Sequence, residues 1–256
     1  MSAEAAARAG HFTSMQVRGG RVQGLDLHLT RLVVASRELY GRDPGQTGLA
    51  RRVREALAGE GLESGDCTVR VRVLPADSPE RAGASNPDGE PPLRIEVDVE
   101  PPRQPSSRPL RVRTHPGTRS CPSVKHLDLQ FQREARSRAR SAGFDDALLL
   151  AADGRIAEGT FWNICFWDGT GVVWPDGPAL AGVTRQLLAG ALQGAGVAQA
   201  RRPLRMDSLP GLAAAFALNS TGIVAIAEID PHAFRGDPEA EALLRRLLAG
   251  VPADPP

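Results

Sequence analysis

Residues 124–169 read VKHLDLQFQREARSRARSAGFDDALLLAADGRIAEGTFWNICFWDG and carry the densest pattern in the chain. After Lys125, apolar residues recur every four positions from Leu127 to Ala139, which predicts a helix that starts at the lysine and is capped by Gly143. Short apolar runs separated by Asp-Gly pairs follow, and such pairs are typical of hairpin turns. The stretch therefore predicts a helix followed by antiparallel strands.

The first half of the chain adds helices and strands of its own. Residues 25–40 place apolar side chains at three-and-four spacing and predict an amphipathic helix. Residues 12–17, 68–73 and 93–99 alternate in the manner of half-buried strands. Because helices and hairpins interleave, we predict a mixed α/β (α+β) fold rather than an alternating, doubly wound one.

The domain organisation predicted from this pattern has two parts. We predict an N-terminal α/β domain over residues 1–114, a connector over 115–122 and a C-terminal domain over 123–256. The connector lies within THPGTRSCPS (residues 114–123), a segment with Pro, Gly and Ser that suits a stiff linker.

Composition excludes several classes of protein. The 256 residues are 41% apolar and 24% charged with a net charge of +1, so no bulk attraction to nucleic acid or an anionic membrane is expected. No apolar run reaches the ~18 residues of a membrane span, and the first ten residues lack the apolar stretch of a signal peptide. Cys67, Cys121 and Cys165 are too far apart for a metal motif. We therefore expect a cytoplasmic protein without a metal site.

The lysine content is unusual. The 31 basic residues are 30 arginines and one lysine, Lys125. A drift in sequence composition that favours arginine could replace every lysine that supplies only positive charge, but it could not replace one that acts as a neutral amine, because a guanidinium stays protonated. Partial burial and the positive end of the predicted helix would both favour the neutral form of Lys125. A lysine that lies at a helix end without a chemical role remains the alternative.

Three further segments carry polar groups suited to binding. Glu158 lies in an otherwise apolar segment and needs a partner, which is either a protonated pyridine nitrogen or an arginine. The segments Ala181–Thr184 and Asn219–Gly222 offer backbone N–H groups and hydroxyls, the equipment of an anion site. Arg31, on the helix predicted at 25–40, could add charge to such a site.

Taken in chain order, these segments resemble the class IV (fold-type IV) family of pyridoxal-phosphate (PLP) enzymes. That family includes branched-chain and D-amino-acid aminotransferases and aminodeoxychorismate lyase. The resemblance runs from His11 to Ile229 and rests on VKHL, on EGTFWN 33 residues after the lysine (158 − 125) and on LAGVTR. It implies a smaller N-terminal domain, a larger barrel-like C-terminal domain with the cofactor between them, and a homodimer.

The resemblance also implies roles for individual residues. Lys125 matches the lysine that forms a Schiff base with PLP and moves the proton at the substrate Cα. Glu158 matches the carboxylate paired with the pyridinium nitrogen, and Asn163 lies near the ring as support. Arg31 matches the arginine that grips the phosphate. On two sides of that phosphate, the resemblance places Val183 and Thr184, and Ser220 and Thr221.

The substrate-binding residues depart from the family pattern. Tyr40 is the only tyrosine, and Gln130 stands where some branched-chain enzymes have one. Four residues remain as candidates to bind a substrate carboxylate: Arg70, Arg72, His115 and Arg119. Arg70 and Arg72 alternate with valine, which also suits the solvated face of a strand.

The sequence therefore predicts a PLP-dependent transaminase that moves an amino group between an amino acid, or a related amine, and a 2-oxo acid. Aminodeoxychorismate lyase is the alternative, because GHFTSMQV resembles the lyase and Thr13 matches a threonine thought to assist proton transfer there. A PLP-free binding module is a third hypothesis, motivated by the loss of tyrosine. Neither the amino donor nor the stereochemistry follows from the sequence.

Overall fold

The structure is a computed structural model that describes residues 8–75 and 93–256. It divides into two compact units that interleave along the chain. The first contains residues 1–103, 123–128 and 252–256, and the second contains 104–122 and 129–251. Within the described residues, no helix has both the length and the apolar character of a membrane span.

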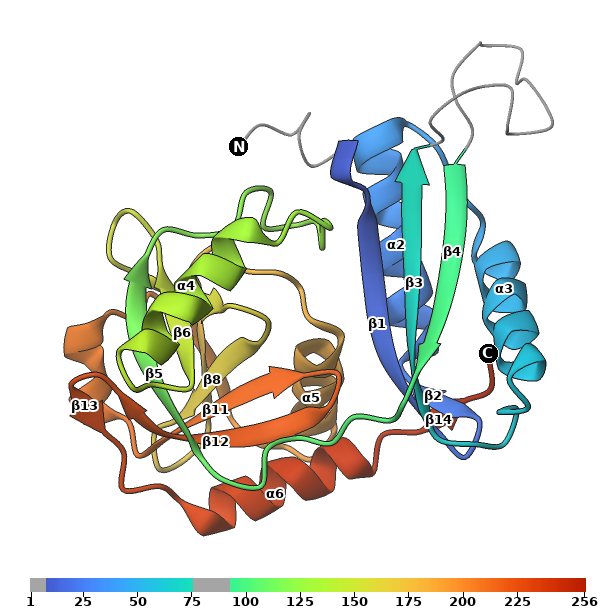
Figure 1. Ribbon diagram of the computed structural model, residues 1–256. Helices are drawn as coiled ribbons and strands as arrows, with labels where there is room; N and C mark the ends of the chain where they lie inside the picture. Colours follow the sequence, from blue (N-terminus) through green and yellow to red (C-terminus); the bar gives the residue numbers. More distant parts are fainter. Residues whose placement is uncertain (1–7, 76–92) are drawn as a thin grey trace. The chain divides into compact units, whose positions relative to one another are not determined.

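In its described residues, the first unit contains a five-stranded sheet and the helices α2 and α3. Its strands run in the order β14-β2-β1-β3-β4, and the sheet is antiparallel throughout. The elements are β1 (His11–Arg18), β2 (Arg21–Gln23), α2 (Leu25–Tyr40), α3 (Gln46–Gly59), β3 (Cys67–Pro75), β4 (Leu93–Glu100) and β14 (Ala253–Asp254). In Figure 1, α2 runs along one face of this sheet.

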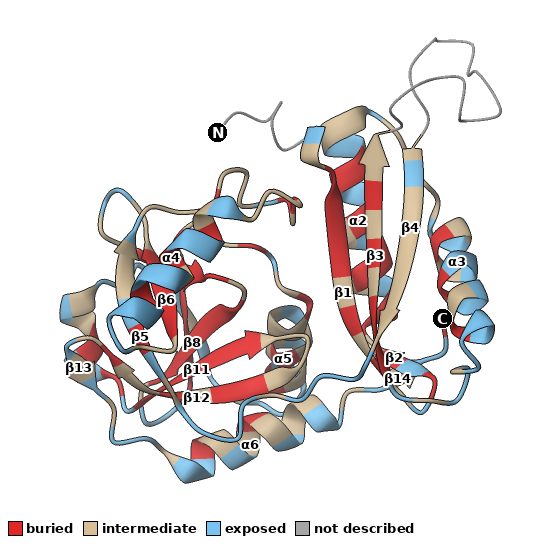
Figure 2. Ribbon diagram, in the orientation of Figure 1, coloured by how far each residue is buried: buried red, intermediate tan, exposed pale blue. Residues whose placement is uncertain are grey.

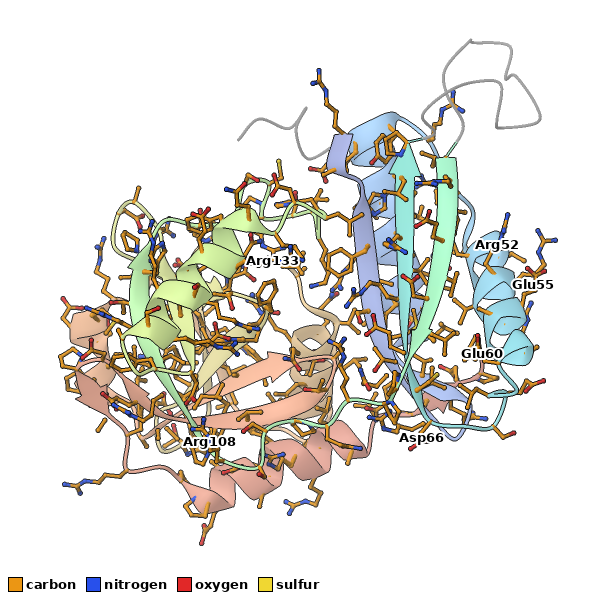
Figure 3. All side chains as sticks on the ribbon, viewed as in Figure 1. Arg52, Glu55, Glu60, Asp66, Arg108 and Arg133 are labelled. Carbon is orange, nitrogen blue, oxygen red and sulfur yellow. The ribbon has the colours of Figure 1, made fainter. Side chains whose placement is uncertain are left out.

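The core of the first unit follows from its sequence pattern. Leu25, Leu29 and Leu32 face inward from α2, while Met15 and Val17 face the helix from β1. Gly41 ends α2 with a positive φ of 66°, a conformation that glycine adopts without steric cost. The helix predicted at residues 25–40 is confirmed. The charged side chains of α3, such as Arg52 and Glu55, point away from the sheet (Figure 3).

The second unit is built on a curled sheet. The strands follow the order β10-β9-β8-β11-β12-β5-β6-β7, with β13 also paired to β12. The elements are β5 (Leu110–Pro116), α4 (Gln130–Ser141), β6 (Asp146–Leu150), β7 (Ile156–Gly159), β8 (Asn163–Trp167), β9 (Val172–Pro175), α5 (Val183–Gly194), β10 (Gln199–Arg202), the 3₁₀ helix η2 (Met206–Gly211), β11 (Ala214–Asn219), β12 (Gly222–Ile229), β13 (His232–Ala233) and α6 (Pro238–Ala249).

The second unit has a deeply buried centre. β8 is buried along its whole length and β11 over most of its length (Figure 2). Phe166, Ile164 and Ala215 belong to one core cluster, whereas Phe216 and Leu188 belong to another that is shared with α5 and α6. The mixed α/β class and the barrel-like second sheet predicted from the sequence are confirmed.

One predicted helix start is wrong. The helix expected to begin at Lys125 begins at Gln130 and ends at Ser141. Residues 125–127 instead pair with β1: the amide of Leu127 donates to Gly10 O at 2.8 Å, and the amide of Phe12 donates to Lys125 O at 2.9 Å. Because α4 begins five residues after Lys125 (130 − 125), its positive end does not lie at the lysine, and the helix dipole cannot act on Lys125 in the predicted way.

Candidate active site

Lys125 lies on a short segment that completes the edge of β1. On β1, only Val17 and Arg18 pair with β2, so the other end of that edge is open to residues 125–127. His126 forms an isolated antiparallel bridge with His11, and both of these side chains are buried. The segment fixes the lysine backbone through main-chain hydrogen bonds and leaves the half-buried side chain to project from it.

Phe12 connects the lysine to an arginine of the same unit. The Lys125 Nζ lies 4.8 Å from the centre of the Phe12 ring, and the Arg70 guanidinium carbon lies 5.7 Å from the same ring centre. Phe12 and Arg70 belong to the face of the sheet opposite the apolar core, because Met15, Val17 and Val71 fill that core. One aromatic ring therefore has two cations around it.

Thr13 lies on the other face of β1 from Phe12. Its side chain is fully buried, and its Oγ1 is 2.6 Å from Nδ1 of His28 on α2. Arg31 lies one turn further along α2 and is half-buried. Burial, together with smaller contributions from the charges of Arg31 and Lys125, lowers the pKa of His28 to about 3. Thr13 therefore contacts a neutral imidazole that lies within the electrostatic influence of Arg31 and Lys125.

The low pKa of His28 predicts a pH-dependent stability. The unfolded chain takes up a proton on this imidazole below about pH 6.5, whereas the folded chain does so only near pH 3. Lowering the pH through this window therefore favours unfolding, by about 1.4 kcal/mol per pH unit. Between pH 6.5 and 5, we expect urea unfolding to show a loss about 2 kcal/mol larger in the wild type than in His28→Gln. Equal losses in the two proteins would contradict a buried neutral His28.

In the second unit, the carboxylate of Glu158 pairs with an arginine. Glu158 is the third residue of β7, and its Oε1 lies 3.0 Å from Nε of Arg119. Both side chains are almost inaccessible, with 4% and 2% of their surface exposed. Oε2 accepts a hydrogen bond from the amide of Leu180 at 3.2 Å. The sequence leaves a protonated pyridine nitrogen or an arginine as the partner of Glu158, and within the protein that partner is Arg119.

Asn163 joins Glu158 to the loop before α5. Its Nδ2 donates to Leu180 O at 2.9 Å and lies 3.4 Å from Glu158 Oε2. Gly182 packs so closely that a Cβ there would lie 1.9 Å from Oδ1 of Asn163. The loop therefore requires glycine at this position, and Asn163 fixes both the carboxylate and the start of α5.

The two predicted anion-binding segments lie together. Val183 and Thr184 open α5, and Thr184 Oγ1 donates to Asn219 O at 2.7 Å. Asn219 ends β11, and its Oδ1 accepts hydrogen bonds from both the amide and the hydroxyl of Thr221. Ser220 lies in the same turn, between the paired residues Asn219 and Gly222. The start of α5 and the turn after β11, which the sequence predicts on two sides of a phosphate, are thus adjacent.

The four candidates to bind a substrate carboxylate differ in the partners that they already have. Arg119 forms a buried ion pair with Glu158. Arg72 donates to Asp98 at 2.9 Å and lies 3.1 Å from Glu96 on the neighbouring strand. His115 is in β5, with its ring 5.6 Å from that of Phe131. Arg70 has a weaker ion pair, 3.6 Å from Glu100, and shares Phe12 with Lys125.

Sequence reasoning missed two residues that organise these groups. His28 is the partner of Thr13, and the HLTRL segment that contains it points in sequence only to Arg31 as a binding residue. Asp146 accepts hydrogen bonds from the side chains of Thr160 and Trp162. Its only signal in the sequence was an acidic residue at the start of an apolar run, GFDDALLL.

Comparison with known proteins places this arrangement in a family. The family model described as amino-transferase class IV matches residues 10–229. No curated protein matches the chain.

Solved structures share the fold over most of their length. A Legionella pneumophila protein assigned as a 4-amino-4-deoxychorismate lyase has 18% identity and a TM-score of 0.82, over 95% of this chain and 91% of that one. A hypothetical aminotransferase from Mycobacterium tuberculosis in its PLP-bound form has 20% identity and a TM-score of 0.81, over 96% and 90%. The branched-chain amino acid aminotransferase of Escherichia coli has 16% identity and a TM-score of 0.81, over 98% and 88%. Because the family model covers most of the sequence, the chain belongs to the class IV aminotransferases.

Proposed function

We propose that this protein is a PLP-dependent transaminase that moves an amino group between an amino acid, or a related amine, and a 2-oxo acid. The observation that carries the proposal is Lys125, the only lysine, held by main-chain hydrogen bonds with its amine beside Phe12. A transaminase needs an amine that exists in the neutral form, and arginine cannot supply one.

The residues present fit PLP. Glu158 is a buried acceptor suited to a cationic ring nitrogen, and a carboxylate accepts about four hydrogen bonds, so the pair with Arg119 does not preclude another donor. The first turn of α5 presents backbone amides, because Gly182 caps it without a side-chain hydrogen bond. Thr221 lies close to Thr184 through Asn219. Arg31, Val183, Thr184, Ser220 and Thr221 would bind the phosphate.

PLP, when bound, supplies an electron sink for bond breaking at the substrate Cα. The chain itself supplies the groups that direct this chemistry. In the proposed reaction, the Lys125 amine would take the proton from the substrate Cα and return it, and the Glu158 carboxylate would hold the cofactor ring at its nitrogen. Asn163 keeps the Glu158 carboxylate and the loop before α5 in fixed positions.

The test is the visible spectrum of the purified protein with PLP, recorded with a panel of amino donors. Bleaching of the band by one donor, with recovery on adding a 2-oxo acid, would support a transaminase and identify half of its substrate pair. Release of pyruvate from aminodeoxychorismate without an amino acceptor would show a lyase instead. The absence of any band would favour a PLP-free binding module.

We further propose that Arg70 binds the substrate carboxylate. Since Lys125 and Arg70 lie 4.8 and 5.7 Å from the centre of one ring, their charged groups are no more than about 10.5 Å apart (4.8 + 5.7). A guanidinium there can form a charge-assisted pair with a carboxylate. Arg70→Gln should raise the KM for an amino acid about 10- to 100-fold, with a smaller effect on kcat, in steady-state kinetics.

Arg72→Gln is the matched control for this prediction. It removes the same side chain two positions along β3, where the arginine is held by Asp98 and Glu96. We expect Arg72→Gln to change KM by less than about threefold, because an ion pair that is one-third exposed contributes little. Equal rises in KM for the two variants would count against Arg70.

A further inference from the structure

Asp146 is a buried carboxylate for which the proposed chemistry has no use. It is the first residue of β6, and the residue is 5% exposed. Five hydrogen bonds converge on it from four residues: two from Arg136, one from the amide of Ala147 and one each from Thr160 and Trp162. Burying a charge at such a site is costly unless its lone pairs are occupied, as they are here, where five hydrogen bonds meet about four acceptor sites.

Two of the donors belong to the turn that joins Glu158 to Asn163. Thr160 Oγ1 donates to Asp146 Oδ1 at 2.6 Å, and the indole Nε1 of Trp162 donates to Oδ2 at 2.9 Å. The turn is closed by one main-chain hydrogen bond, from the amide of Gly159 to Trp162 O at 2.8 Å. Asp146, which is not part of the turn, therefore binds two of its side chains, the hydroxyl of Thr160 and the indole of Trp162.

The indole also presses on the residue that follows Glu158. A Cβ on Gly159 would lie 2.0 Å from the Trp162 ring, so the ring packs flat against the Gly159 backbone. The hydrogen bond from Nε1 to Asp146 holds the indole ring of Trp162 in this orientation. The position of the ring in turn fixes the backbone at the end of β7, one residue from the Glu158 carboxylate.

We propose that Asp146 is a positioning residue that sets the spacing between Glu158 and Asn163 through the turn at residues 159–162. The proposal rests on the proposed function, in which Glu158 holds PLP. It predicts a local loosening of the turn when the Asp146 charge is removed, and a matching loss of affinity for PLP.

Asp146→Asn is the test variant, because it keeps the shape while placing an amide donor against other donors. Asp145→Asn is the adjacent control: Asp145 pairs with Arg108, a side chain that is 68% exposed and is labelled in Figure 3, and it accepts a hydrogen bond from the Arg111 amide. Leu149→Ala is the stability control. Leu149 is fully buried in β6 and packs in one cluster with the alanines of α4. Leu149→Ala therefore weakens the packing of α4 against β6, the strand that also carries Asp146.

The first measurement is hydrogen–deuterium exchange of residues 156–163 in the protein without PLP. We expect faster exchange of this segment in Asp146→Asn than in Leu149→Ala at a matched fall in melting temperature, and wild-type exchange in Asp145→Asn. The second is PLP affinity by equilibrium dialysis, where Asp146→Asn should bind about tenfold more weakly, in line with losses of second-layer hydrogen bonds elsewhere. If Asp146→Asn fails to fold, Trp162→Phe removes one of the turn's two side-chain donors and should show the same local change at smaller size.

Unchanged exchange in Asp146→Asn would overturn the proposal. So would an equal loss of PLP affinity in Leu149→Ala at a matched fall in melting temperature, because the effect would then follow stability alone. If the wild type takes up no PLP, the proposed function fails, while the exchange comparison still decides whether Asp146 positions the turn.

Discussion

Lys125→Ala should reduce turnover by about 10³-fold or more and prevent covalent retention of PLP. The fold should persist, because the Lys125 segment is held by main-chain hydrogen bonds to Gly10 and Phe12 that alanine keeps. The lost contact with the Phe12 ring should lower the free energy of unfolding by no more than about 1 kcal/mol. Borohydride reduction followed by mass spectrometry would measure retention, and urea unfolding would measure stability.

Lys125→Arg is the sharper control for this prediction. It keeps a cation beside the Phe12 ring, yet its guanidinium stays protonated and cannot act as a nucleophile or base. We expect wild-type stability with turnover as low as in Lys125→Ala. Since the chain has one lysine, reduction with borohydride cannot fix PLP on another lysine. Residual turnover of either variant above a few per cent would refute the proposed chemistry.

Much of the fold was predictable where a local pattern sufficed. The periodicity of residues 25–40 predicts α2 because the same spacing that forms an apolar stripe also fills the core with Leu25, Leu29 and Leu32. The alternation of Thr68–Val73 predicts β3 for the same reason. Local patterns succeed where one element both forms and buries its own apolar face.

Long-range pairing was not predictable. Residues 125–127 resemble the start of a helix, and only the open edge of β1, more than 100 residues earlier, draws them into a bridge. β5 pairs in parallel with both β6 and β12, although its sequence, LRVRTHP, has few apolar residues. Such positions depend on which partner edge is free, and no window of sequence contains that information.

In the candidate site too, the sequence identifies individual residues but not the partners that the fold brings to them. The residue types at Lys125, Glu158 and Thr184 were sufficient to identify them as candidates. Their partners were not identifiable, because 30 arginines could in principle pair with Glu158 and only the fold selects Arg119. From the sequence, Arg119 is a candidate to bind the substrate carboxylate. In the structure it is buried against Glu158 and forms an ion pair with that side chain instead.

Arg119→Met should destabilise the second unit strongly. The substitution leaves the Glu158 carboxylate buried without its cation, and breaking a buried pair from one side costs about 3–5 kcal/mol. Urea unfolding followed by tryptophan fluorescence reports on this unit, because Trp162, Trp167 and Trp174 all lie in it. The measurement uses the protein without PLP, so it does not depend on the proposed chemistry.

The double variant Glu158→Gln/Arg119→Met separates an ion pair from simple packing. If Arg119 acts through Glu158, removing the carboxylate removes the uncompensated charge, and the double variant should be about 2 kcal/mol more stable than the sum of the single changes predicts. If the two losses add, Arg119 contributes only volume to the core. A favourable coupling would mean that the same arginine maintains Glu158 as the carboxylate that the proposed site requires, because a neutral side chain at position 158 would no longer attract a cationic ring nitrogen.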